Sequence, residues 1–146
     1  MLAFNDWHIH GVQDRIHFLN LYVAYKDRAL FRKWMEDHNV LKIGSLIMVR
    51  YFNVTLPREK CCGDRCRGDP LANHLQSLLE SNNLLDIRPL PLSQTYFNGR
   101  TGDAHIGKRW DQFFVHENLV EGLGNMKTWV VRSHISDHLP IVLQWR

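Results

Sequence analysis

Two short segments that are apolar on both faces, with a helical stretch between them, constrain the fold of this chain more than any other feature. Residues 16–23 and 46–51 are rich in β-forming side chains and too short for typical helices, so we expect strands buried on both sides. Between them, residues 27–41 carry apolar side chains at helical spacing behind Asp27, which can cap a helix. This order predicts a mixed α/β (α+β) structure in which helices cover the faces of a sheet.

The remainder of the chain predicts one more helix and several strands. Asp69 followed by Pro70 is typical of a helix start, with an aspartate cap and a proline at the first helical position. Short β-forming runs follow, and we expect strands at 84–87, 95–97, 110–115, 130–133 and 140–145. Residues 56–68 hold charges, glycines and a proline, which predicts an exposed loop.

Length and composition describe one globular domain with a modest positive charge. The 146 residues are 45% hydrophobic and 23% charged, which supplies a core and argues against disorder. The net charge of +3 permits a nucleic-acid partner without demanding one, because the Lys and Arg residues form no long block. No apolar stretch approaches the roughly 18 residues of a membrane span, and the first residues do not resemble a secretory signal. We therefore expect an intracellular protein, with the nucleus among the compartments that fit.

Three cysteines, Cys61, Cys62 and Cys66, lie in one short loop. Their odd number and the strain of a disulfide between neighbours argue against a secreted disulfide scaffold. A zinc site would need a fourth ligand, for which His74 is the only nearby candidate. Reduced thiols are the simpler interpretation, and they suit an intracellular compartment.

Four short motifs follow one another along the chain. They are Asn20-Leu21-Tyr22-Val23-Ala24-Tyr25, Tyr51-Phe52-Asn53, Asn98-Gly99-Arg100 with Arg109-Trp110-Asp111-Gln112-Phe113, and Ser136-Asp137-His138-Leu139-Pro140-Ile141. In order and spacing they resemble the later motifs of the endonuclease/exonuclease/phosphatase (DNase I-like) superfamily, and the residues between them are most similar to plant LINE-type retroelement endonucleases. Each motif alone is weak, since Ser-Asp-His also occurs in turns and helix caps, so the resemblance depends on the four together.

The resemblance implies both a fold and an incomplete domain. Residues 14–146 would form the C-terminal part of a two-sheet β-sandwich with flanking helices. The N-terminal part of the family domain supplies several strands and a metal-binding Glu. Residues 1–13, a poorly defined N-terminal segment, contain no Glu and do not replace it.

The resemblance also implies Mg²⁺- or Mn²⁺-dependent hydrolysis of phosphodiesters in nucleic acid, with DNA as the first expectation. Asp137 is the metal-ligand candidate, and His138 would contact the scissile phosphate or manage the proton. Asp111 would hold the His138 imidazole in one tautomer. Asn53 would orient water or phosphate, and Tyr22 would offer its phenol to the phosphate.

Two loop residues, Asn98 and Arg100, would contact phosphate or bases. Taken singly, several candidates have structural alternatives: Tyr22 as a core residue, Asp111 as a strand-edge charge, and Asn98 with its glycine as a turn. We expect Asp86 to be structural. The other histidines share no ligand spacing, and we expect them to be surface or incidental residues: His8, His10, His17, His38, His74, His105, His116 and His134.

One departure from the family pattern predicts weak or absent hydrolysis. The family's Gly-Asp-Phe-Asn is here Arg50-Tyr51-Phe52-Asn53. A phenol with a pKa of about 10 cannot replace a carboxylate at neutral pH, and losing such a group costs on the order of 10²–10⁴ in rate. With the metal-binding Glu also missing, we expect weak metal binding. Two interpretations stay open: an impaired endonuclease, or a non-catalytic nucleic-acid or phosphate-binding remnant of a retroelement.

Overall fold

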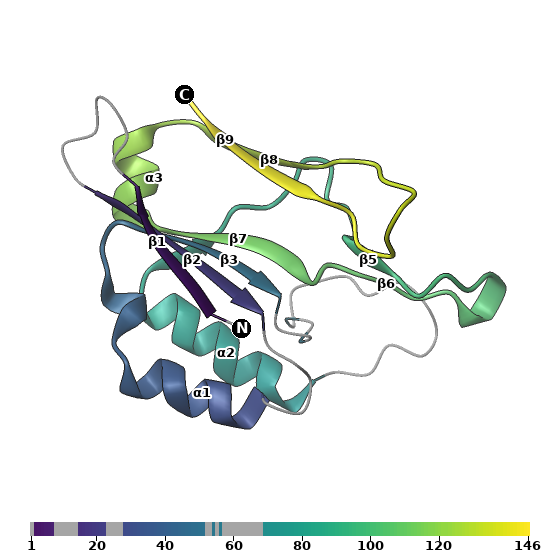
Figure 1. The fold of residues 1–146 in the computed structure, drawn as a ribbon, viewed down its shortest axis with the longest axis horizontal. Helices are drawn as coiled ribbons and strands as arrows, with labels where there is room; N and C mark the ends of the chain where they lie inside the picture. The colour runs from purple at the N-terminus through teal and green to yellow at the C-terminus, as the bar shows by residue number, and fades with distance from the viewer. Residues whose placement is uncertain (1, 8–14, 23–27, 52–53, 55, 57–68) are drawn as a thin grey trace.

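The computed structural model describes residues 2–7, 15–22, 28–51, 54, 56 and 69–146 (Figure 1). Its strands are β1 (Leu2–Trp7), β2 (Ile16–Tyr22), β3 (Leu46–Tyr51), β4 (Leu84–Asp86), β5 (Tyr96–Phe97), β6 (Gly107–Lys108), β7 (Asp111–His116), β8 (Met126–Val130) and β9 (Ile141–Trp145). Its α-helices are α1 (Arg28–Asp37), α2 (Pro70–Ser81) and α3 (Glu117–Leu123), and short 3-10 turns lie at η2 (Val40–Lys42) and η3 (Gly102–Ala104).

A five-stranded sheet with the order β1-β2-β3-β7-β4 forms the centre of the molecule. The predicted unit of strand, helix and strand supplies β2, α1 and β3, and the two strands pair in parallel. Strands β1, β7 and β4 are antiparallel to their neighbours. The sheet is therefore mixed, as the order of predicted elements indicates.

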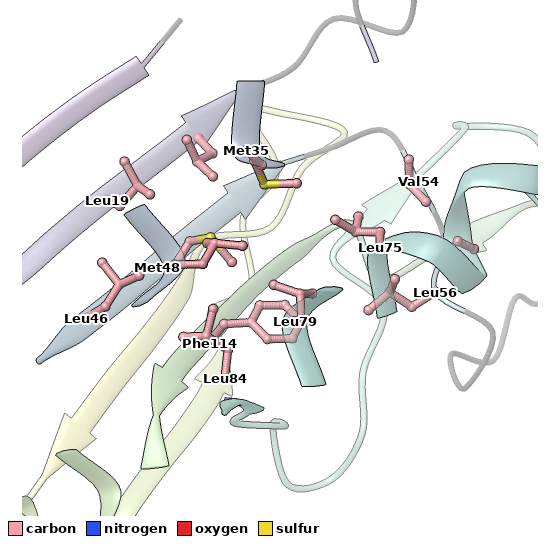
Figure 2. Close-up of a cluster of buried hydrophobic side chains, with 13 residues drawn as sticks. Leu19, Met35, Leu46, Met48, Val54, Leu56, Leu75, Leu79, Leu84 and Phe114 are labelled. Atoms are coloured by element: carbon pink, nitrogen blue, oxygen red, sulfur yellow. The ribbon is translucent and has the colours of Figure 1, made fainter. Parts of the chain in front are cut away.

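Helices α1 and α2 cover one face of this sheet (Figure 1). Alternate residues of the strands point to this side, and Leu19, Met48 and Phe114 are buried there against Met35 of α1 and Leu79 of α2 (Figure 2). Such burial of apolar surface is the main driving force of folding.

Helix α2 begins as predicted, because the Asp69 carboxylate accepts the backbone N–H of Leu71 at 3.0 Å and Pro70 takes the first helical position. Helix α1 ends earlier than its apolar pattern predicts. Asn39 adopts a left-handed φ of 40°, and the following residues form the 3-10 turn instead of a further helical turn.

The two-stranded β8–β9 sheet lies over the opposite face (Figure 1). Buried Ile47 and Val115 of the central sheet form a second core with Leu119 of α3, and Leu143 and Trp145 of β9 pack against it. The central sheet is thus buried on both sides, by helices on one and by a second sheet on the other. This confirms the predicted two-sheet α/β architecture.

Besides the early end of α1, three local features differ from the sequence expectation. The strand expected at 130–133 is instead β8, because its pairing with β9 extends back to a Met126–Trp145 pair. Strand β1 lies in the segment expected to be poorly defined, where it pairs with β2 at the edge of the sheet.

The third difference is a correction. His116 is buried, not a surface or incidental residue, and its Nδ1 accepts the backbone N–H of Asn118 at 3.3 Å as the cap of α3. Helix α3 was not predicted because its cap is a histidine instead of the Ser, Thr, Asp or Asn that usually signals a helix start.

Some sequence predictions concern residues outside the described part of the chain, namely Asn53, the Asp27 cap and the cysteine loop. Within the described residues, no helix is long and apolar enough to cross a membrane.

Candidate functional site

Two candidate side chains, Tyr22 and Asp111, lie in line with Tyr51 across one edge of the central sheet, where β2 and β3 end. The register pairs Tyr22 with Tyr51 and Tyr51 with Asp111. Strands β2 and β3 are parallel, so their carboxyl ends meet at this edge, and antiparallel β7 begins there. Their side chains point away from α1 and α2, because the preceding Leu21 belongs to the core on the helix side.

His138 joins this row through the loop that precedes β9. Its Nδ1 lies 3.0 Å from Oδ2 of Asp111, and both side chains are partly exposed. The backbone N–H of His138 donates to Oγ of Ser136 at 3.0 Å. Asp137, beside it, is exposed. The structure thus brings Tyr22, Asp111 and His138 together, as the motif order implies.

Thr95 holds this arrangement in place, although no motif or spacing in the sequence singles it out. It is fully buried, and its Oγ1 accepts the backbone N–H groups of Trp110 at 3.1 Å and Asp111 at 3.0 Å. Its carbonyl accepts the N–H of Leu139 at 2.7 Å, and the Asp137 carbonyl accepts an N–H from β5 at 3.0 Å. The threonine therefore ties the start of β7 to the loop that carries His138.

Tyr51 occupies the middle of the row. Its ring stacks on Tyr22 with centroids 5.1 Å apart and meets His138 edge-on at 4.8 Å. Burial raises the pKa of Tyr51 from 10.0 to about 12, with smaller contributions from Tyr22, Asp111, Tyr96 and Asp137. The side chain is therefore a neutral phenol at physiological pH and cannot act there as a carboxylate would.

This raised pKa predicts a loss of stability at high pH. Below pH 10 the phenol is protonated in both folded and unfolded chains; between pH 10 and 12 the unfolded chain ionises first, so stability falls as pH rises through this window. We expect Tyr51→Phe to reduce this fall in the free energy of unfolding between pH 10 and 12, because phenylalanine does not ionise. Urea unfolding of both proteins between pH 8 and about 11 measures it, and parallel curves for the two proteins would contradict the assignment.

The described residues at this edge offer few ligands to a divalent cation. Among the described residues, no group of three or more His, Cys, Asp and Glu side chains lies close enough to hold a metal ion. Asp111 is engaged by His138, and Tyr51 is a neutral phenol, so Asp137 is the exposed carboxylate that the described residues place beside this row. Mg²⁺ dehydrates reluctantly and is usually held by one or two carboxylates together with substrate phosphates.

The two candidate substrate-binding residues lie on the arm formed by β5, η3 and β6, which projects from the sheets (Figure 1). The side chain of Asn98 folds this loop: Nδ2 donates to the Ala104 carbonyl at 2.8 Å, and Oδ1 accepts the N–H of Ile106 at 3.0 Å. Arg100 is exposed. A direct role for either residue in substrate binding stays a prediction.

Asp86 and Arg109 form an ion pair beside the site. Arg109 is buried, and its Nη1 donates to Oδ1 of Asp86 at 3.0 Å while Nη2 donates to Oδ2. Arg88 reaches the same carboxylate at 3.0 Å from a more exposed position. The pair links the end of β4 to the residues just before β7, which accords with the structural role expected for Asp86.

Comparison with known proteins identifies the fold. No family model matches the chain, and no curated protein matches it. Among solved structures, the chain is similar to the endonuclease domain of TRAS1, a telomere-specific non-LTR retrotransposon, with a TM-score of 0.67 and 16% identity over 99% of this chain and 63% of that one. It is also similar to the 3'-5' exonuclease NExo from Neisseria meningitidis, with a TM-score of 0.59 and 16% identity over 99% of this chain and 70% of that one.

These likenesses show that the chain has the DNase I-like nuclease fold, as its four motifs imply. The chain spans less than two thirds of the length of the TRAS1 endonuclease domain.

Proposed function

We propose that this chain is a nuclease-fold domain that binds nucleic acid, with DNA as the first expectation. We propose further that its hydrolysis of phosphodiesters is impaired. The observation that carries the proposal is the row at the sheet edge. It keeps the hydrogen bond between Asp111 and His138, yet it places the neutral phenol of Tyr51 against the His138 ring.

The imidazole and the carboxylate support phosphate recognition. Because Asp111 engages Nδ1 of His138, Nε2 is the ring nitrogen that can form a hydrogen bond with a phosphate oxygen. Hydrolysis also needs a metal ion and a positioned water, which stabilise charge that develops on the phosphoryl oxygens. Tyr51 supplies neither a carboxylate ligand nor a base at neutral pH. Binding is therefore the better supported part of the function.

We expect Mg²⁺ and Mn²⁺ to bind weakly, because Asp137 is a single exposed carboxylate. Divalent affinity follows the number of charged ligands, so calorimetry should detect no site tighter than about 10 μM. A matched titration of the Asp137→Asn variant shows how much of any weak heat of binding comes from this carboxylate. A site below that limit in the unmodified chain would contradict the expectation.

A second candidate is a non-catalytic nucleic-acid or phosphate-binding remnant of a retroelement, of the plant LINE type that the motifs resemble. The ring packing favours it. Besides Tyr51 and His138, Tyr96 stacks on Trp110 with centroids 4.2 Å apart, and the Lys108 ammonium lies 5.2 Å from the Trp110 ring. Aromatic rings next to a cation are a common means of holding nucleic acid without cleaving it. A nuclear location would suit both candidates.

Binding is tested by the fluorescence anisotropy of labelled DNA at several salt concentrations. Lys108→Ala should weaken binding and lower the salt slope by about one, the effect of losing one phosphate contact. Lys33→Ala is the matched control, because Lys33 is an exposed lysine of α1, on the other side of the sheet. Absence of binding, or equal effects of the two variants, would refute the proposed function.

A further inference from the structure

Five rings form a continuous aromatic wall at the candidate site: Tyr22, Tyr51, His138, Tyr96 and Trp110. Each ring contacts the next, with centroid distances of 5.1 Å for Tyr22–Tyr51, 4.8 Å for Tyr51–His138, 5.1 Å for His138–Tyr96 and 4.2 Å for Tyr96–Trp110. The wall draws on β2, β3 and β5, the residue before β7, and the loop before β9.

The wall contains two flat stacks, one at each end, joined by His138. Tyr22 and Tyr51 are nearly parallel, with 7° between their planes, and Tyr96 and Trp110 are inclined by 22°. A ring that holds a cation does so over its open face, and cages surround the cation with several rings. In these two pairs the rings cover one another's faces, and a further planar group can extend such a stack, whereas His138 meets Tyr51 at 71° and Tyr96 at 46°.

The charged residues around the aromatic wall indicate where a nucleobase and where a phosphate could bind. Asp111 is the neighbour of Tyr51 in the sheet, and Asp137 is near enough to act on the same phenol, so a phosphate over the Tyr51 ring is disfavoured. Lys108 lies at the Trp110 end, where it attracts one. A nucleobase is uncharged, so it can stack on the two tyrosines while the sugar-phosphate backbone that carries it runs towards Lys108.

We propose that the Tyr22–Tyr51 stack binds an unpaired nucleobase, so that the site prefers single-stranded to double-stranded nucleic acid. This inference rests on the proposed function and specifies its ligand. Tyr22 remains 53% exposed although it stacks on Tyr51, which leaves it accessible. An unpaired base offers its face to such a ring, whereas a duplex covers that face with neighbouring bases. Stacking on one aromatic side chain is worth about 5- to 150-fold in affinity.

The test compares three labelled probes of equal length by anisotropy: a single-stranded oligonucleotide, an abasic deoxyribose-phosphate strand, and a duplex. The unmodified chain should bind the first at least about fivefold more tightly than the other two. Tyr22→Leu should abolish this preference, and Tyr22→Phe should keep it. Both substitutions are at an exposed strand end, and circular dichroism verifies the fold of each.

Other outcomes overturn the inference in distinguishable ways. Equal affinity for the base-containing and abasic strands, with the Lys108→Ala effect intact, refutes base stacking and leaves the proposed function standing. If Tyr22→Phe loses as much affinity as Tyr22→Leu, the phenol O–H contacts the ligand instead of the ring face. Displacement of the oligonucleotide by millimolar choline would make the wall a cation site. Absence of binding to any probe refutes the inference and the proposed function together.

Discussion

Replacing Asp86 with alanine is expected to lower the free energy of unfolding by about 3–5 kcal/mol, the usual cost of removing one partner of a buried ion pair. The Arg109 side chain is only 3% exposed, and the Asp86 carboxylate receives both of its Nη groups. Without this carboxylate, the guanidinium keeps its charge in a site that is shielded from water. Urea unfolding measures the change.

Arg88→Ala is the matched control for Asp86→Ala. Arg88 contacts the same carboxylate at 3.0 Å, but its side chain is 42% exposed, so its loss should cost less than about 1 kcal/mol. A small cost for both variants would mean that water screens the Arg109 pair. Asp86→Ala is also expected to disturb the site, because Arg109 directly precedes Trp110 and Asp111 in the chain.

Tyr51→Asp is expected to raise the rate of metal-dependent nicking by less than about tenfold. This is a small gain, because a positioned general base contributes on the order of 10²–10⁴ to the rate of an intact enzyme. The substitution restores a carboxylate beside Asp111, but it does not supply the Glu that the resemblance assigns to an N-terminal segment. Groups that act as one unit are strongly non-additive, and electrostatic stabilisation by the metal usually contributes more to the rate than a positioned base does. Restoring the carboxylate alone should therefore gain little.

The matched variants for Tyr51→Asp are Tyr51→Phe and a graft. Tyr51→Phe keeps the ring that packs on Tyr22 and His138, so it should leave nicking at the level of the unmodified chain. Fusing the N-terminal segment of an active DNase I-like nuclease to the Tyr51→Asp chain should gain far more than the sum of the two separate changes. A nicking rate for Tyr51→Asp alone within tenfold of that of the active DNase I-like nuclease would contradict this explanation.

The parts of the fold that follow from local pattern were predictable. Strand β3 occupies the predicted 46–51, because burial on both faces requires an uninterrupted apolar run. The start of α2 follows from the Asp69 cap and the proline behind it. Helix α3 was missed because a histidine caps it, and β8 was misplaced because its register depends on pairing with β9.

The candidate site was predictable only where the motifs name its residues. The resemblance places Tyr22, Asp111 and His138 together, and the structure brings them to one sheet edge. Thr95 and the ring of Tyr96 could not be found in this way. Their contacts join segments far apart in the sequence, and neither spacing nor periodicity signals a hydroxyl that accepts two backbone N–H groups across a loop.

If Tyr51 impairs the chemistry at an edge that still binds nucleic acid, the unmodified chain should nick plasmid DNA poorly in Mg²⁺. The decisive measurement is this nicking rate, with His138→Ala as the control for contaminating nuclease. We predict little or no nicking, at the same level in both proteins. Robust nicking by the unmodified chain that His138→Ala abolishes would contradict the proposed impairment, because the site would then hydrolyse phosphodiesters despite the phenol.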